Sequence, residues 1–390
     1  MKVDRSNGML RVDFYKNLHL VLIIGRDCDH CLVFFNEKGD IDENDWTWYG
    51  CKMFYQGFFM FSFSRISSLF LASCFISKLF SAEIEPHVFK QESFFWGTGP
   101  LLAPTPYTVP AGHVNIEPYL SFTSFSGFYN EHWKYKSTPN FYATTLQIPV
   151  RVGLNSFMEF FCLPQCSYQS TKGISSTQVK DLPLVLGFQL VKAVPSRWYP
   201  GIKLSLLVSA PIGKYKQLNP SKLFTDAAGS GSWSPEAALT FGKIFSLPQN
   251  HVLSTRFTID YTITTSVRVK GLNSYGGAPT AKGTVYPGNL LNFDLNFEYN
   301  FTRNWVGALD IHYTHINKTT FSGYMPLGAP ALASAVVAPV GPSVESFSLA
   351  PALEYNFNSN IGLIGGVWFS VAGRNAVTFT SGVLALNIYI

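Results

Sequence analysis

One stretch of sequence decides the fold: Leu291-Asn292-Phe293-Asp294-Leu295-Asn296-Phe297-Glu298-Tyr299-Asn300-Phe301. Every odd-numbered position in it is apolar and every even-numbered position is polar, which is the period of a β-strand and not of a helix. A run of about eleven residues matches a transmembrane strand tilted by about 45° and is about twice the usual length of a strand in a soluble protein. The stretch therefore predicts a membrane-spanning strand with one side facing lipid and one facing a lumen.

The composition of the chain excludes most other classes of protein. Of its 390 residues, 47% are hydrophobic, 16% are aromatic and 14% are charged, whereas about 25% are charged in typical soluble domains. The 31 Gly, 23 Pro and 34 Phe favour many short strands joined by turns. A net charge of +5 is too mild and too dispersed for a nucleic-acid partner, and 6 Cys are too few for a disulfide scaffold.

The alternating pattern recurs beyond residue 112 and predicts an all-β fold, a closed antiparallel transmembrane β-barrel over residues 113–390. Barrels of this kind have an even number of strands, with short turns at one end and long connections at the other. Longer connections are expected at 128–140, 170–181, 215–232, 269–288 and 319–344. The predicted strands are 113–127, 141–153, 157–169, 182–193, 201–214, 233–245, 252–268, 289–302, 305–318, 345–357, 361–372 and 377–390.

The polar faces of these strands are expected to line the lumen. They carry charges of both signs with acids in excess, which predicts a polar passage with a mild preference for cations. A filled lumen cross-linked by ion pairs is the alternative, because small barrels are often packed inside. The lumen candidates are Glu117, Arg151, Glu159, Lys203, Glu236, Arg256, Asp260, Asp294, Glu298, Asp310, His312 and Glu354.

Many basic residues lie in or beside the predicted long connections. Such a rim would attract the anionic headgroups of lipopolysaccharide, and an unspecific solvated rim is the alternative. The residues are Lys134, Lys136, Lys172, Lys180, Lys214, Lys216, Lys222, Arg268, Lys270, Lys282, Lys318 and Arg374.

The front of the chain is predicted to lie outside the barrel. Residues 60–82 have the cation, the apolar run and the small residues of a secretory signal peptide. Because a signal peptide begins close to the initiator, we expect translation to start at Met53 or Met60 rather than at Met1. Residues 1–59 would then be an upstream extension, untranslated or outside the fold, and residues 1–52 show no alternation of strand length. Residues 71–74 also have the shape of a lipobox, in which Cys74 would be lipidated.

Two further features of the sequence leave alternatives open. Within a Pro-rich segment at 83–112, residues 99–110 carry four prolines and form either an extended periplasmic lead or a piece folded into the barrel mouth. Cys162 and Cys166 form a candidate disulfide only if the strand bends at Pro164, because four residues of straight strand span about 13 Å, beyond the reach of a disulfide.

No catalytic, cofactor or metal site stands out, so we do not expect an enzyme. An outer-membrane hydrolase needs a Ser or Thr nucleophile beside a His and an orienting group. Asp310 and His312 share the predicted lumen face and would make half of an acid–base pair, but no nucleophile accompanies them. The pair Cys28 and Cys31 lacks the partners that a metal or redox site needs.

Several short motifs, in order, resemble the outer-membrane family named for the meta pathway of phenol degradation. They are Gly112–Tyr119, Val152–Asn155 with Met158-Glu159, Pro211–Tyr215, Ser232–Glu236, Leu353–Phe357 and Ala372–Asn375. The resemblance implies a transporter-like barrel of the Gram-negative outer membrane, in a family of which some members are suspected of admitting hydrophobic or aromatic compounds. It implies no catalytic residues. The chain departs from the usual aromatic last residue, which the barrel assembly machinery reads, because it ends at Ile390.

Together these features predict an outer-membrane channel or facilitator for passive uptake of small, hydrophobic or aromatic solutes. The alternative is a plugged structural or surface-interaction barrel whose basic loops bind lipopolysaccharide or an external ligand. The expected partners are outer-membrane lipids, lipopolysaccharide, the barrel assembly machinery and a small-molecule solute.

Overall fold

The computed structural model describes strand residues 2–6, 9–14, 18–25 and 28–36, followed by residues 97–194, 197–326 and 337–390. The chain divides into two units, Met1–Val88 and Phe89–Ile390. The predicted signal peptide, the alternative starts Met53 and Met60, and Cys74 lie outside the described residues. No described helix is long and apolar enough to cross a membrane.

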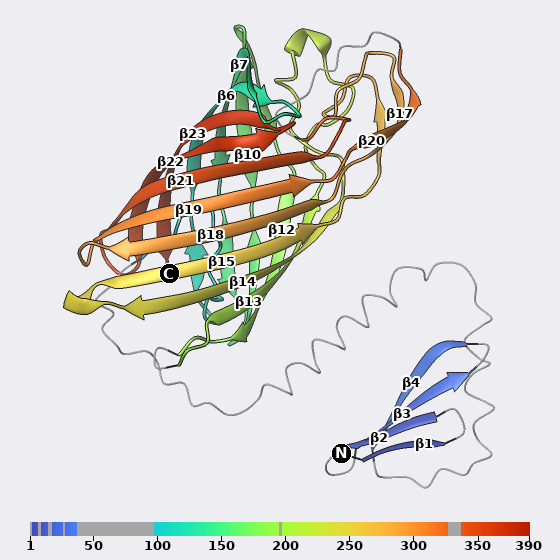
Figure 1. Ribbon diagram of the computed structural model, residues 1–390, viewed down its shortest axis with the longest axis vertical. Coiled ribbons are helices and arrows are strands. Elements are labelled where there is room, and N and C mark those ends of the chain that lie inside the picture. The colour runs from blue at the N-terminus through green and yellow to red at the C-terminus, as the bar shows by residue number, and fades with distance from the viewer. Residues whose placement is uncertain are drawn as a thin grey trace. The chain divides into compact units, whose positions relative to one another are not determined.

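The first unit contains a four-stranded antiparallel sheet (Figure 1). Its strands are β1 (Lys2–Ser6), β2 (Met9–Phe14), β3 (Leu18–Gly25) and β4 (Cys28–Asn36), paired in sequence order. The sequence did not predict these strands because its apolar residues run consecutively, as in Leu20-Val21-Leu22-Ile23-Ile24, and do not alternate. A continuous apolar run carries no period that distinguishes a strand from other buried segments.

The second unit is the predicted closed antiparallel barrel (Figure 1). Its sheet has 16 strand segments, and four barrel strands consist of two segments each, which leaves 16 − 4 = 12 strands. The last strand pairs with both segments of the first, which closes the barrel. The two-segment strands are β5 (Val114–Ile116) with β6 (Tyr119–Tyr129), β7 (Tyr135–Gln147) with β8 (Val150–Gly153), β9 (Met158–Cys162) with β10 (Gln165–Thr171), and β11 (Ile174–Val179) with β12 (Leu182–Val191).

The remaining barrel strands are uninterrupted. Three of the four interruptions coincide with Pro118, Pro149 and Pro164, since proline has no N–H to donate to the ladder. The uninterrupted strands are β13 (Gly201–Ala210), β14 (Ser234–Ser246), β15 (Val252–Thr262), β18 (Leu290–Asn300), β19 (Trp305–Ile316), β21 (Val344–Asn356), β22 (Ile361–Arg374) and β23 (Val377–Tyr389).

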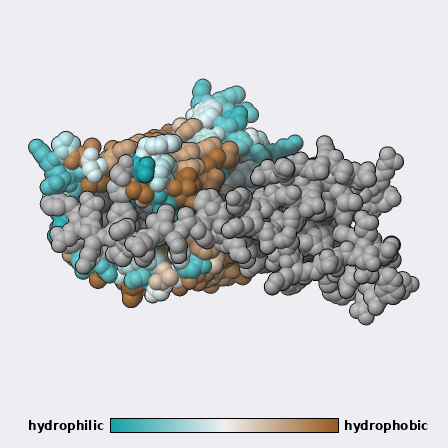
Figure 2. Space-filling model, turned by 90° about the horizontal axis from the view of Figure 1, so that it is seen from below, coloured by the Kyte–Doolittle hydropathy of each residue, from teal (hydrophilic) through white to brown (hydrophobic). Residues whose placement is uncertain are grey.

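The alternation that predicted the fold separates the two faces of the wall. On β18, Asp294, Asn296 and Glu298 are 6%, 0% and 1% exposed, whereas Leu295 and Phe297 are 38% and 37% exposed. The polar residues therefore point inward and the apolar residues point toward lipid. Figure 2 shows hydrophobic residues across the visible barrel wall and hydrophilic residues on parts that project from it.

The connections differ in length between the two barrel ends, as predicted. Short turns join β8 to β9, β14 to β15, β18 to β19 and β21 to β22, and both Val114 and Ile390 lie at this short-turn end. Two predicted long loops are wrong, because strands continue through most of 128–140 and 170–181. These extensions carry polar residues on both faces, so they lack the alternation that lipid imposes.

The other long connections have structure of their own. β16 (Val267–Lys270), β17 (Lys282–Tyr286) and β20 (Thr320–Tyr324) pair into a three-stranded sheet at the opposite, long-connection end. The β13–β14 connection contains the short 3-10 helix η2 (Pro220–Lys222), and η3 (Pro248–Asn250) forms the turn before β15.

A charge placed on the lipid-facing side tests this assignment. Leu295→Lys is expected to lower the free energy of unfolding in lipid by about 2–4 kcal/mol, because a lysine near the bilayer midplane must be desolvated. Val179→Lys, at a 58% exposed position on β11, is the matched control and should change it little. Equal losses from both variants, measured by urea titration in liposomes, would contradict the assignment.

Candidate functional site

The lumen contains a plug, residues 97–111, at the short-turn end. The sequence leaves open whether residues 99–110 form a periplasmic lead or fold into the mouth, and the structure places them inside. Three inward carboxylates accept backbone N–H groups of the plug: Glu354 from Thr98 at 2.9 Å, Asp310 from Leu101 at 3.1 Å, and Glu159 from Val109 at 2.9 Å. Acceptors on β21, β19 and β9 therefore hold the plug across the lumen.

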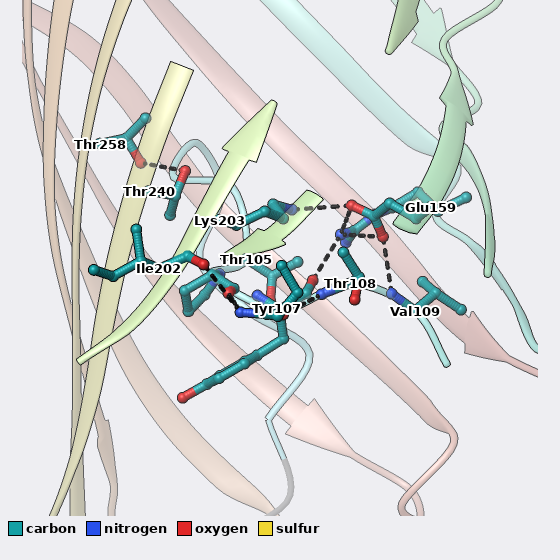
Figure 3. Close-up of polar contacts among 12 residues, drawn as sticks. Thr105, Tyr107, Thr108, Val109, Glu159, Ile202, Lys203, Thr240 and Thr258 are labelled. Carbon is teal, nitrogen blue, oxygen red and sulfur yellow. Dashed lines mark hydrogen bonds and ion pairs between the residues drawn. The ribbon is translucent and has the colours of Figure 1, made fainter. Parts of the chain in front are cut away.

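Other lumen side chains satisfy more of the plug backbone. Gln189 accepts the N–H of Thr108 at 2.9 Å and donates to the carbonyl of Pro106 at 3.0 Å. Arg151 donates to the carbonyl of Tyr107 at 3.3 Å. Figure 3 shows the plug residues Thr108 and Val109 beside Glu159. Because a Pro-rich segment cannot form a strand ladder, side chains of the wall take the place of a neighbouring strand.

Inward-facing glycines make room for the plug. An ideal Cβ on Gly242 would lie 2.3 Å from Pro106 Cγ, and one on Gly362 would lie 2.0 Å from Thr98 Cγ2. Both distances are far below carbon–carbon contact, so the plug fills the space that a side chain would need. Three more wall glycines have Cβ positions within 3 Å of plug atoms: Gly153, Gly201 and Gly366.

The plug also has an apolar contact with the wall. Leu101 forms a buried cluster with Ala350, Ile364 and Ala385, and Trp368 packs against this cluster. The plug is therefore held both by hydrogen bonds to charged groups and by apolar packing.

Ion pairs link the wall strands beside the plug. Glu159 Oε1 lies 3.0 Å from both Arg151 Nη2 and Lys203 Nζ; the Glu159 and Lys203 side chains are almost fully buried and Arg151 is partly buried. Arg256 lies 2.8 Å from Glu298. The structure thus brings together the predicted lumen residues of β8, β9 and β13, and separately those of β15 and β18. Asn387 Nδ2 donates to Glu117 at 2.8 Å.

Farther toward the long-connection end, the charged wall is acidic. Asp260 accepts from Asn292 at 2.7 Å, Glu236 accepts from Thr262 at 2.8 Å, and Asp294 contacts His312. Among the described residues, none of these carboxylates pairs with Arg or Lys. Asp310 contacts the plug, so the structure does not join it with His312 as an acid–base pair.

Strands β6, β7, β22 and β23 carry an inward aromatic group that was not predicted from the sequence. Phe125 lies 6.1 Å from Phe141 and 6.4 Å from Phe379, and the Phe379 ring lies 4.8 Å from Trp368. These residues share the inward face with Thr123 and Ser381, whose hydroxyls lie 2.8 Å apart. The available signal was Phe125, an aromatic ring in the polar, inward-facing register of its strand.

The β13–β14 connection folds against the lumen side of neighbouring strands at the long-connection end. Gln169 Nε2 donates to the carbonyl of Ala227 at 2.7 Å. Asp181, which the sequence did not single out, accepts the N–H groups of Gly213 at 2.9 Å and Ser230 at 2.7 Å. The connection therefore narrows the lumen at the end opposite the plug.

The remaining sequence-predicted positions form no further site in the described residues. Cys162 and Cys166 flank the interruption at Pro164, the bend that a disulfide between them would need. Both are free cysteines in the structure, and their pairing stays a prediction. No group of three or more His, Cys, Asp or Glu in the described part of the chain is arranged to hold a metal ion.

Comparisons with known proteins support the fold. No family model matches the chain, and no curated protein matches it in sequence. The COG4313 outer membrane channel from Pseudomonas putida F1 matches with a TM-score of 0.55 and 12% identity over 74% of this chain and 100% of that chain. The NanC porin matches with a TM-score of 0.35 and 10% identity over 70% of this chain and 98% of its own. The second likeness is too slight to bear on function.

The closed wall, the lipid-facing belt and the first of these likenesses define a class. The chain has the fold of an outer-membrane β-barrel of Gram-negative bacteria.

A larger side chain at one of the inward-facing glycines that make room for the plug should displace the plug. In a background without native cysteines, Leu101→Cys is expected to react slowly with a maleimide, because residue 101 is only 7% exposed. Adding Gly242→Leu should speed labelling by at least about tenfold, since its side chain would occupy the position of Pro106. Gly382→Leu is the control, with no atom within 4 Å of its Cβ. Equal labelling rates for both variants would contradict the claim that the plug fills the space beside Gly242.

Proposed function

We propose that the chain is an outer-membrane channel for passive uptake of small hydrophobic or aromatic solutes, and that displacement of the plug limits passage. The observation that carries this proposal is the inward aromatic group of Phe125, Phe141, Phe379 and Trp368. Aromatic rings that face a lumen, rather than lipid, supply stacking surfaces for flat apolar molecules.

The lumen suits a small aromatic solute with a polar substituent. Trp368 connects the aromatic group to the apolar cluster around Leu101 of the plug, so an apolar surface extends down to the plug. The acceptors Asp260 and Asp294 lie next to this surface, because the His312 ring, which contacts Asp294, lies 6.2 Å from the Trp368 ring. A solute that stacks on Trp368 is able to donate a hydrogen bond to these acceptors.

The plug is the element that must move. A cavity of about 290 Å³ beside it is bounded by plug residues and by wall residues such as Arg151, Arg256 and Glu298. This is close to the lower limit for small-molecule sites. The plug is held by hydrogen bonds that water can replace, and displacement would join this cavity to the rest of the lumen.

A second candidate function is a plugged barrel that serves as a structural or surface-interaction protein. It is favoured by the plug, which Glu159, Asp310 and Glu354 hold at one end of the lumen, and by the β13–β14 connection, which Asp181 binds and which narrows the other end. In this case the basic loops would be the functional surface.

Uptake measurements separate the two candidates. Gram-negative cells that have a lipopolysaccharide-covered outer membrane and express the protein should take up radiolabelled toluene faster than the same cells without the protein. Trp368→Ala combined with Phe379→Ala should reduce the added uptake by about tenfold, because each aromatic contact contributes roughly 0.5–1.5 kcal/mol beyond its area.

The control is Phe257→Ala with Phe293→Ala, which removes a stacked pair from the lipid-facing side, where the ring centroids are 6.3 Å apart. It should leave uptake unchanged. A folded, heat-modifiable barrel that adds no uptake would overturn the channel and favour the second candidate.

A further inference from the structure

A groove lies on the outside of the barrel where its wall meets the three-stranded sheet. This junction groove has a volume of about 440 Å³ and is lined by Tyr286, Pro287, Gly288, Asn289, Asn317, Lys318 and Thr320. It forms because the chain leaves the barrel after β19 and re-enters it before β18, so that two connecting segments run beside each other. Its lining offers two amides, an exposed tyrosine ring and a lysine.

Directly below the groove, the outer wall is aromatic and faces lipid. Asn289 Nδ2 donates to the hydroxyl of Tyr261 at 3.0 Å, which ties the groove to the upper boundary of this wall. On the same face, the Phe293 ring lies 6.1 Å from the Tyr313 ring. Aromatic rings at a barrel rim mark the interface between acyl chains and headgroups. The groove is therefore at headgroup level.

Above the groove, one face of the three-stranded sheet is basic. Lys270 and Lys282 are direct cross-strand partners, and both are exposed. Neither forms an ion pair within the described residues, and the same holds for the exposed Arg268. Like charges placed opposite each other on a sheet are destabilising, so an anion bound between them would relieve the repulsion.

The sheet cannot turn this basic face away from solvent. Its other face carries Val267, Val269 and Val285, which are 1%, 3% and 1% exposed and pack with Tyr275. Because the valines are buried against the loops, the alternation of the strands forces the cations outward. A nearby acid, Glu345 on β21, is paired with Arg374 at 2.6 Å and so offers little repulsion to an anion.

We propose that the junction groove binds the phosphorylated saccharide headgroup of lipopolysaccharide, with the acyl chains lying on the aromatic wall below. The vertical order of the outer face carries this inference: apolar rings, then the amides, Tyr286 and Lys318 of the groove, then Lys282 and Lys270 on the basic face of the sheet. That order matches an amphiphile with acyl chains, a sugar and phosphates. The site does not depend on the proposed channel, because all of its groups lie outside the lumen.

Native mass spectrometry of the full chain, purified in detergent, tests the site with lipopolysaccharide as the probe. The variant Lys270→Gln, Lys282→Gln, Lys318→Gln is expected to bind lipopolysaccharide about a hundredfold more weakly, since each cation near an anionic headgroup surface contributes roughly a fivefold factor. Lys134→Gln, Lys136→Gln, Lys172→Gln is the matched control, because it removes the same charge from the β6–β7 and β10–β11 hairpins. It should bind as the parent does.

Three outcomes would overturn the proposal. Equal weakening by both triple variants would show only a diffuse basic rim. Unchanged binding by the groove variant would show that lipopolysaccharide binds elsewhere or not at all. Competition by inorganic phosphate at concentrations near those of lipopolysaccharide would show a site for soluble anions, since a lipid site should also need the acyl chains. Heat-modifiable migration of each variant confirms that the barrel is folded before binding is compared.

Discussion

The rest of the structure depends on one constraint: each backbone N–H and carbonyl at membrane depth must find its partner inside the protein. Unpaired groups cost several kcal/mol in lipid, so the twelve strands close through the pairing of β23 with β5 and β6. The plug obeys the same constraint by another route. Its prolines prevent a ladder, and inward carboxylates, Gln189 and Arg151 bind its backbone instead.

Closure of the wall produces a lumen with two unlike sides. The strands from β14 to β19 carry most of its charged groups, and β6, β7, β22 and β23 carry the aromatic group. The plug contacts both polar and apolar groups of the wall, because its N–H groups bind carboxylates while the Leu101 side chain packs against Ile364 and Ala385. Glycines at positions such as Gly242 and Gly362 leave the space that the plug fills. Wall and plug are thus complementary in charge, polarity and shape.

The barrel was predictable from the sequence because lipid imposes a strict alternation on its strands, as in residues 291–301. The hairpin extensions beyond the membrane were not, since Ser137 and Thr177 have polar neighbours on both faces and no lipid to sort them. The inward-facing charged residues could be predicted from the alternation of polar and apolar residues along each strand, but their ion-pair partners could not. The pairing of Glu159 with Arg151 and Lys203 depends on strand register and on the diameter of the barrel. The sequence did not decide the position of the plug either, because its contacts join residues far apart in the chain, such as Thr98 and Glu354.

Tethering the plug tests the central claim most directly. An ideal Cβ on Gly242 would lie 2.8 Å from the Cβ of Pro106, and a small shift brings this to the ~3.8 Å of a disulfide. Pro106→Cys with Gly242→Cys should therefore form a disulfide between plug and wall in a background without other cysteines. Single-channel conductance in a planar bilayer is then recorded before and after reduction. If the plug must be displaced for passage, the oxidised protein carries no current and reduction produces discrete current steps. Identical currents in both states would contradict the claim that the plug controls the lumen.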